Sequence, residues 1–472
     1  MSEGVEREHE EVPSRHPLAA LSFGAILTFV GGRLRRGPRA VEQSATPLAE
    51  QAAAVADRRG IYALLAAEAV GQVGNMMVFV AGPWFVLETT GSAARTGIVT
   101  GALALGAVIP AVLGGPLVDR LGHKRSSVLA DLASAATVAA VPLLYLADIL
   151  QFWQLVVLMF VLSSINSQGD TARYALVPFL ADRARMPIER ANGADRAIVR
   201  LGQVLGPVLG GILIAVIGAA NVLFVDAASF IVSAILVAVG LPAAANRGER
   251  AEAAGGRSYL AELREGLRFI RAHTVLLAMI LIATVGNFLD KPLMVVILPV
   301  YFKTFYDSPT SLGLALGAFG AGALAGSLLF GAIGRGWPRR LTFLTCWVLG
   351  PLVIFGTLAA TPPLWVVVPA GMVGGLLFGP INPLASTVIQ EHTPPEMLGR
   401  VFGALTALAQ AGIPIGAVLA GVVVQRAGLV PTILGMGVIY LLVTLSMVFN
   451  RSLRQMDTPR RSKPPGTAPV LE

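Results

Sequence analysis

The sequence predicts an all-α membrane protein that crosses the bilayer about twelve times, in two halves of six helices. Three observations support this fold class: an apolar composition, the recurrence of long apolar stretches, and basic residues that fall on alternate sides of those stretches. Of the 472 residues, 55% are apolar and only 14% are charged, and the mean hydropathy is +0.71. Since a soluble domain typically carries about 25% charged residues, this composition excludes an ordinary soluble fold.

The apolar stretches are long enough to be membrane-spanning helices. A helix needs about 20 mainly apolar residues to cross the hydrocarbon core, and such stretches follow one another between turn and charge signals. Residues 17–32 are apolar but short, so we expect an interfacial helix or disordered arm there, with insertion in the membrane as the alternative. The expected spans are 62–87, 94–117, 127–146, 153–177, 192–217, 221–241, 275–301, 310–333, 341–358, 364–389, 401–425 and 431–449.

Basic residues indicate which ends of these spans face the cytoplasm. Lys and Arg cluster after every second span and in the tail, whereas only Arg95, Lys303 and Arg426 fall on the other side. By the positive-inside rule, both termini and the middle segment are cytoplasmic, as an even number of spans requires. The net charge of +8 and the pI near 10.0 therefore report orientation, and we expect no nucleic-acid partner.

A long polar stretch separates the spans into six and six. The segment from Ala243 to Arg271 is the longest interruption between apolar stretches. The acidic start of the chain has the wrong sign for a signal peptide. The expected regions are a partly disordered cytoplasmic arm (1–60), the first six-helix half (61–242), a cytoplasmic central loop (243–272), the second half (273–450) and a cytoplasmic tail (451–472).

The two halves repeat one another at constant sequence offsets. One group pairs Ser92, Gly97, Gly101, Gly115 and Lys124 with Ser308, Gly313, Gly317, Gly331 and Arg340. A second group pairs Arg190, Gly193, Gly206, Gly211 and Gly218 with Arg400, Gly403, Gly416, Gly421 and Gly428. Runs at fixed offsets are harder to obtain by chance than single glycine matches. Parallel six-helix repeats are a transporter architecture whose substrate site lies at the repeat interface near the midplane.

A charged motif follows the second expected span. Its conformational residues are Gly115, Asp119, Arg120, Gly122, Lys124 and Arg125. Gly115 permits close helix approach, Asp119 can pair with basic residues or a helix N-terminus, and Gly122 makes the turn, so we expect a latch that breaks as the halves rock. The alternative is an ordinary basic loop that fixes topology. The motif resembles the major facilitator signature G-x-L-x-D-R-x-G-R-K/R-R, with His123 in place of one Arg.

The fifth expected span carries a second glycine motif. Its residues are Gly202-Gln-Val-Leu-Gly206-Pro207-Val-Leu-Gly210-Gly211. Small residues at this spacing let backbones touch, and Pro207 removes a backbone hydrogen bond and kinks the helix. The motif resembles the G-x-x-x-G-P-x-x-G-G sequence of drug:proton antiporters, although a general small-residue packing face has a similar pattern.

With these motifs and the segment 83–92, the chain is similar to the macrolide, siderophore and Tap-type multidrug exporters of the major facilitator superfamily. The resemblance extends from Tyr62 to about Phe449 and implies the major facilitator fold, an inner-membrane location and efflux of small organic compounds. One departure concerns the first span, where Tap-type pumps have Gly-Asp and this chain has Gly74-Asn75. A proton-binding acid at that position therefore does not carry over.

Polar side chains inside the apolar spans mark the expected transport site, because such groups are costly to place in a membrane and are therefore functional candidates by default. Glu68, Gln72 and Asn75 share one helical face, and Asp170 and Arg173 are spaced for an ion pair. The candidates for binding the substrate or protons are Glu68, Gln72, Asn75, Asp170, Arg173, Arg200, Asn287, Asp290 and Gln410.

The roles of the charged candidates differ. Glu68 and Asp290 lie well inside their spans, so they lead as sites of proton coupling, and Arg200 can neutralise Glu68 or Asp170. The pair Asp170–Arg173 is either part of the cavity or structural. We interpret Asp131 and Asp226 as structural anchors between helices. We expect Lys291 to point away from Asp290, and Pro292 to break the hydrogen-bond ladder.

These observations and the resemblance predict a proton-coupled exporter of a small amphipathic drug or secreted metabolite, working by alternating access. The alternatives are a siderophore exporter or an importer of the same fold, or a non-transporting receptor or scaffold, against which the polar faces argue. The sequence has no P-loop, HExxH or GxSxG motif, so neither ATP-driven transport nor an enzyme is expected. The expected partners are the substrate, protons and the bilayer, and the chain is expected to be a monomer. We expect no cofactor and no metal, since Cys346 is the single cysteine.

Overall fold

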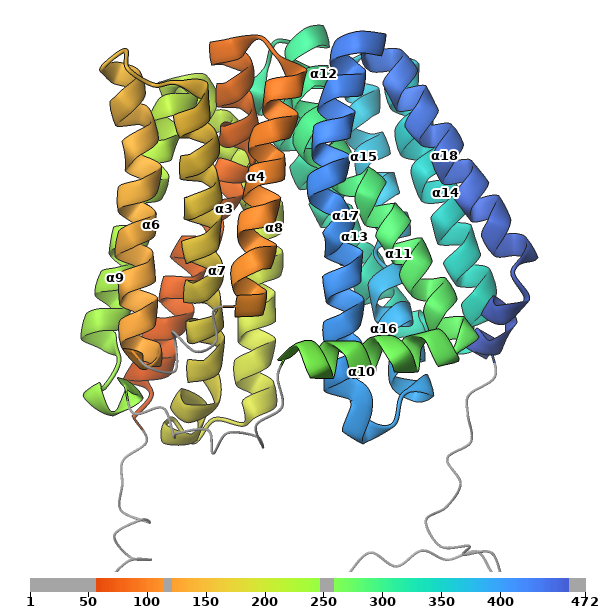
Figure 1. The fold of residues 1–472 in the computed structure, drawn as a ribbon, viewed down its shortest axis with the longest axis horizontal. Coiled ribbons are helices and arrows are strands. Elements are labelled where there is room, and N and C mark those ends of the chain that lie inside the picture. Colours follow the sequence, from red (N-terminus) through yellow and green to blue (C-terminus); the bar gives the residue numbers. More distant parts are fainter. Residues whose placement is uncertain (1–56, 114–120, 247–258, 458–472) are drawn as a thin grey trace, which may run out of the picture. The chain divides into compact units, whose positions relative to one another are not determined.

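The computed structural model of the protein describes residues 57–113, 121–246 and 259–457 (Figure 1). Across these ranges the regular structure is helical, and eleven helices are long and apolar enough to cross a membrane. A further helix, α4 (Ala93–Leu113), is also apolar, but its apolar part Ala93–Val108 is shorter than those eleven helices. The expected all-α membrane fold is therefore confirmed. Residues 1–56 of the expected N-terminal arm, with 17–32 among them, lie outside the described residues, and α3 begins at Arg59, within the range expected for the arm.

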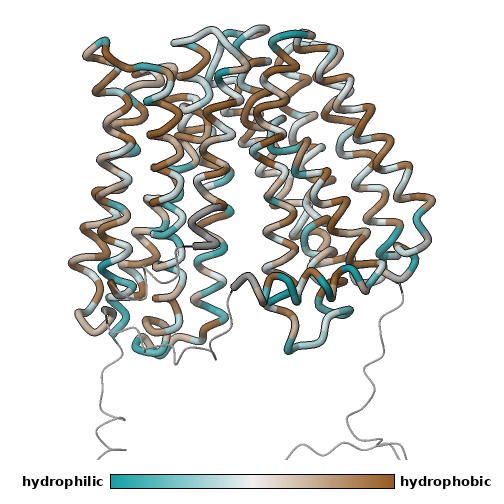
Figure 2. The backbone as a smooth tube through the Cα atoms, viewed as in Figure 1, coloured by the Kyte–Doolittle hydropathy of each residue, from teal (hydrophilic) through white to brown (hydrophobic). Residues whose placement is uncertain are grey.

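The first half consists of six long helices grouped together in Figure 1. The helix α3 packs against α8 and α9, while α7 packs against α4 and α6. Figure 2 shows that apolar residues run along these helices for most of their length, as a lipid-facing bundle requires. The helices are α3 (Arg59–Thr90), α4 (Ala93–Leu113), α6 (His123–Leu146), α7 (Phe152–Arg183), α8 (Ile188–Ile217) and α9 (Ala219–Gly240).

The second half repeats the arrangement with more interruptions. Its first span runs through α11, a π-helical turn and α12, and the π turn begins directly after Pro292, where the break in the hydrogen-bond ladder was expected. The elements are α11 (Thr274–Pro292), the π turn (Leu293–Ile297), α12 (Leu298–Phe305), α13 (Pro309–Ile333), α14 (Arg339–Ala359), α15 (Leu364–Phe378), α16 (Ile381–His392), α17 (Leu398–Ala427) and α18 (Leu429–Phe449).

A short amphipathic helix, α10 (Tyr259–Ala272), joins the halves and lies across the ends of the second-half helices (Figure 1). Gly266 and Ile270 are buried, whereas Arg264, Arg268 and Arg271 are exposed at a spacing that places them on one helical face. The Arg400 Nη1 atom donates a hydrogen bond of 3.0 Å to Glu265, which ties α10 to α17. We call this end of the bundle the α10 end.

The halves meet mainly at two helix crossings, α4 with α17 and α8 with α13. A Cβ atom built on Gly97 would lie 3.2 Å from the Cα of Gly421, and one built on Gly211 would lie 3.1 Å from the Cα of Gly313. Glycine allows two backbones to approach this closely because it has no side chain. All four glycines belong to the two groups that repeat between the halves. The sequence repeat therefore has a structural reason at these crossings.

The repeat also includes two matching turns. Gly218 separates α8 from α9 with φ +83°, and Gly428 separates α17 from α18 with φ +88°. Glycine adopts such positive φ values at little cost, whereas a side chain would strain the backbone. Each turn reverses the chain between two long helices at the end of the bundle opposite to α10 (Figure 1).

Candidate functional site

A cavity of about 660 Å³ lies between the two halves and takes most of its lining from the second half. The first half contributes residues from α3 and α8, including Met76, Gln203 and Pro207. A volume in this range suits a drug-sized organic molecule. The size and position of the cavity make it the candidate substrate site.

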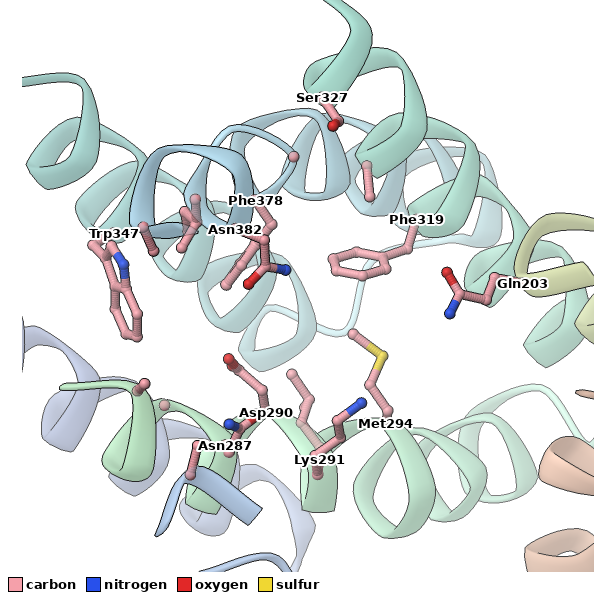
Figure 3. A pocket seen from close by; sticks show the side chains of 18 of the residues that line it. Gln203, Asn287, Asp290, Lys291, Met294, Phe319, Ser327, Trp347, Phe378 and Asn382 are labelled. Carbon is pink, nitrogen blue, oxygen red and sulfur yellow. The ribbon is translucent and has the colours of Figure 1, made fainter. Parts of the chain in front are cut away.

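The cavity walls are mainly apolar, and aromatic and sulfur-containing side chains stand among aliphatic ones. Figure 3 shows Met294, Phe319, Trp347 and Phe378 around the space, and these come from the π turn, α13, α14 and α15. Aromatic faces and flexible Met side chains can pack against many apolar shapes. The walls therefore suit an amphipathic molecule without demanding one shape.

Polar groups are a minority of the cavity lining, and three of them lie close together on α11. Asn287, Asp290 and Lys291 occupy consecutive turns at the end of α11, and Asn382 and Gln203 lie on other sides of the space (Figure 3). This group immediately precedes Pro292 and the π turn, and π-helical insertions in α-helices are frequent at functional sites. A few placed polar groups in an apolar pocket can orient a bound ligand.

Asp290 has a defined partner on α18. The Tyr440 hydroxyl donates a hydrogen bond of 3.0 Å to the Asp290 Oδ2 atom, and the Tyr440 side chain is 1% exposed. Lys291, one position further along α11, also lines the cavity. The site therefore contains a carboxylate and an ammonium group on neighbouring positions.

A second polar site lies within the first half, around the Arg173 guanidinium. Arg173 Nη1 lies 2.7 Å from Asp131, Nη2 lies 2.6 Å from Asp170, and Nε lies 3.2 Å from Glu68. The Ser233 hydroxyl donates a 2.7 Å hydrogen bond to the other oxygen of Asp131. We call these five residues, from α3, α6, α7 and α9, the Arg173 cluster.

Charge is unbalanced in the Arg173 cluster. Three carboxylates contact one guanidinium, so two negative charges remain uncompensated when all three acids are ionised. Arg173 and Asp131 have side chains that are 5% and 2% exposed, whereas Asp170 is 56% exposed and connects the cluster to the outside. Like charges at such distances disfavour one another, so the cluster is a place where a proton can be held.

The structure separates the predicted site residues into several environments. Asn287, Asp290 and Arg200 line the cavity, while Glu68, Asp170 and Arg173 belong to the Arg173 cluster. Arg200 does not serve as the neutralising partner expected for Glu68 or Asp170, because its guanidinium donates instead to Gln203 at 3.2 Å.

The remaining polar candidates lie outside the cavity lining. The Asn166 amide donates a 3.1 Å hydrogen bond to Asn75, which links α3 to α7. Gln72 packs against Gly202 of α8. Gln410 is exposed on α17 and does not contribute to the lining.

The glycine motif of α8 packs this helix on two neighbours. Gly206 faces Met76 and Gly210 faces Met77, both on α3, while Gly211 faces Gly313 on α13. Pro207 lines the cavity between these contacts. The motif thus joins the cavity wall to the crossing between the halves.

The charged motif after the second span is described only in part. Gly115, Asp119 and Arg120 lie outside the described residues, so the expected latch remains a prediction. Gly122 has φ +83° directly before α6, and the Lys124 Nζ atom donates a 2.7 Å hydrogen bond to the carbonyl oxygen of Leu241 at the end of α9. Arg125 lies in the first turn of α6.

Sequence reasoning missed several residues of these sites. It assigned Asp131 an anchoring role without identifying Arg173 as its partner, and it passed over Tyr440, Trp347 and Asn382. An acid within an apolar span was a usable signal for Asp131. The aromatic residues gave no such signal, because aromatic side chains are common throughout membrane helices.

Comparison with known proteins identifies the family. The family described as transmembrane secretion effector matches residues 53–471. The multidrug efflux pump Tap of Mycolicibacterium fortuitum is 35% identical over 397 residues, which cover 84% of this chain and 96% of that protein. Tap of Mycobacterium tuberculosis is 33% identical, with 85% and 96% covered. Macrolide efflux protein A of Streptococcus pyogenes is 23% identical, with 84% and 97% covered.

Solved structures show the same fold at low sequence identity. A mutant of the nucleoside transporter NupG has a TM-score of 0.70 at 12% identity and covers 82% of this chain and 99% of its own. A D-xylose-proton symporter has a TM-score of 0.64 at 14% identity, with 85% and 98% covered. Family, relatives and fold are those of transporters and not of enzymes. The chain belongs to the major facilitator superfamily, in the drug-efflux subfamily described as transmembrane secretion effectors.

Proposed function

We propose that the chain exports a small amphipathic organic compound across the cytoplasmic membrane in exchange for protons, by alternating access. The observation that carries this proposal is the cavity of about 660 Å³ between the halves, with mainly apolar walls that include aromatic rings and with Asp290 in its lining. Relatives named for multidrug and macrolide efflux support export of drug-sized compounds. The walls suit the apolar body of such a compound, and the polar lining residues suit its polar groups.

The α10 end faces the cytoplasm in this proposal, with both chain termini on that side. The exposed Arg264, Arg268 and Arg271 of α10 support this orientation through the positive-inside rule. The cavity lining reaches Ile389 and Phe402, close to the α10 end. The two glycine crossings lie at the opposite end. This arrangement suits a state that takes up substrate from the cytoplasm.

Proton coupling is assigned to one carboxylate in each half. Asp290 lines the cavity and accepts a hydrogen bond from Tyr440, so a proton bound there changes the charge that the substrate meets. Glu68 belongs to the Arg173 cluster, where three acids compete for one guanidinium. A carrier must bind its proton in one state and release it in the other, and both sites offer acids in polar surroundings within apolar helices.

Uptake into everted membrane vesicles tests this proposal. Vesicles that contain the protein should accumulate at least one compound from a panel of fluorescent amphiphiles and antibiotics, and a protonophore should abolish the accumulation. Asp290→Asn should lower accumulation at least tenfold. Asp307→Asn is the matched control, because this acid pairs with Lys303 and its side chain is 74% exposed. Vesicles that match those of a host without the protein for every compound would refute export.

A further inference from the structure

A second, smaller cavity lies between α14 and α18 and is lined by these two helices. Its volume is about 200 Å³, and most of its lining consists of aliphatic side chains, aromatic rings and glycine. No charged residue belongs to the lining. The Tyr440 hydroxyl donates to Asp290, and the Thr444 hydroxyl donates to the backbone carbonyl oxygen of Tyr440. We call this space the α14–α18 crevice.

The crevice opens toward the bilayer. Leu352, Leu434, Val438 and Leu441 form its rim, and these side chains are between 53% and 60% exposed. They lie within two spanning helices, more than one turn from either end, at the depth of the hydrocarbon core. The medium that faces the crevice is therefore hydrocarbon and not water.

The back of the crevice is an aromatic wall shared with the transport cavity. The Trp347 and Tyr440 rings have centroids 5.4 Å apart, and those of Phe355 and Tyr440 are 5.8 Å apart. Trp347 and Phe355 line both the crevice and the transport cavity. The hydroxyl of Tyr440 reaches Asp290 on the cavity side. An occupant of the crevice would thus contact Tyr440, whose hydroxyl donates to the cavity carboxylate.

Two glycines create the space. A Cβ atom built on Gly356 of α14 would have no heavy atom within 4 Å, and one built on Gly437 of α18 would lie 3.2 Å from the Phe355 Cβ atom. Both glycines line the crevice. A larger side chain at Gly356 would therefore fill the crevice from within, without a clash at its Cβ atom.

We propose that the α14–α18 crevice binds one acyl chain of a bilayer phospholipid. An empty apolar space would forfeit the dispersion contacts of its lining, and water has too few polar partners there to occupy it. The absence of charge from the lining fits a hydrocarbon chain and not a headgroup. Lipid binding in the crevice does not depend on the transported compound, so it can be tested separately from the export proposal.

Tryptophan quenching by brominated lipid tests the site. The protein is reconstituted in phosphatidylcholine with bromine atoms at mid-chain, using a variant in which Trp347 is the single tryptophan. The replacements are Trp84→Phe, Trp153→Phe, Trp337→Phe and Trp365→Phe. Although its side chain is 5% exposed, Trp347 should lose at least half of its fluorescence, because the crevice brings the chain to the indole. If this variant does not fold, the quenching of Trp347 is obtained as the difference in quenching between the parent protein and the Trp347→Phe variant.

Two glycine variants decide the result. Gly356→Leu fills the crevice and should reduce the quenching of Trp347 at least twofold. Gly435→Leu makes the same change at an exposed position of α18 outside the lining, where a Cβ atom also meets no neighbour, and should leave the quenching unchanged. Unquenched Trp347, or equal quenching in the two glycine variants, would overturn the proposal.

Discussion

At the scale of single residues, the first half depends on Arg173. Three acids from three helices converge on this buried guanidinium. Removing one partner of a buried ion pair leaves uncompensated charge, which typically costs about 3–5 kcal/mol, whereas a solvent-screened pair contributes little. The three carboxylates and the guanidinium therefore contribute unequally to stability, and the buried groups contribute most.

This difference predicts the effects of two substitutions. Arg173→Met should lower the thermal stability of the detergent-solubilised protein strongly, because Glu68 and Asp131 lose their cation. Asp170→Asn should change stability little, since that carboxylate is 56% exposed. Melting curves followed by fluorescence would compare the two variants. Equal melting temperatures for Arg173→Met and the parent would contradict the structural role of the cluster.

Tyr440 provides a milder test at the cavity. Tyr440→Phe keeps the ring packed on Trp347 and Phe355 but removes the hydroxyl that donates to Asp290. A lost hydrogen bond of this kind is typically worth about 1 kcal/mol, or roughly fivefold in an equilibrium. We expect transport to shift in its pH dependence while the melting temperature changes little. An unchanged pH profile would mean that the hydroxyl does not influence the proton site.

At the scale of helices, the glycine crossings fix how closely the halves meet. Gly97→Val or Gly211→Val should prevent the close approach of α4 to α17 or of α8 to α13, because the new side chain meets backbone atoms of the other half. The matched control is Gly403→Val on α17, where a Cβ atom meets nothing within 4 Å. We expect export to fall at least tenfold in the crossing variants and little in the control, at equal amounts of protein in the membrane. Export at the control's level would show that these contacts are not needed.

The helices also show what the sequence could and could not predict. Apolar length located the spans, and constant offsets identified the glycines, because both are local patterns. The pairing of Gly97 with Gly421 and of Glu68 with Arg173 joins residues far apart in the sequence, so spacing alone could not reveal it. Helical periodicity also gave no sign of the π turn that follows Lys291 and Pro292 and interrupts the regular helix there.

At the scale of the whole molecule, the orientation in the membrane is open to a direct test. Reporter domains fused after Gly255 and after Lys463 should both be active only in the cytoplasm, since basic residues flank both positions. A reporter after Arg95 should behave in the opposite way. A periplasmic signal at Gly255 would contradict both the orientation and the twelve-span layout.

Alternating access requires the end opposite to α10 to open during each transport cycle. The Ser92 hydroxyl and the Gln425 side-chain oxygen lie 3.2 Å apart across the two halves at that end. In a Cys346→Ser background, the pair Ser92→Cys and Gln425→Cys can be joined by a short, reducible thiol crosslinker. Each single variant treated in the same way serves as the control.

Export by this double variant, measured before crosslinking, after crosslinking and after reduction, tests alternating access most directly. We predict that crosslinking stops export while substrate binding from the α10 end persists, and that reduction restores export. Export at the parent rate by fully crosslinked protein would contradict the account, because the substrate would then leave without separation of the halves at this end.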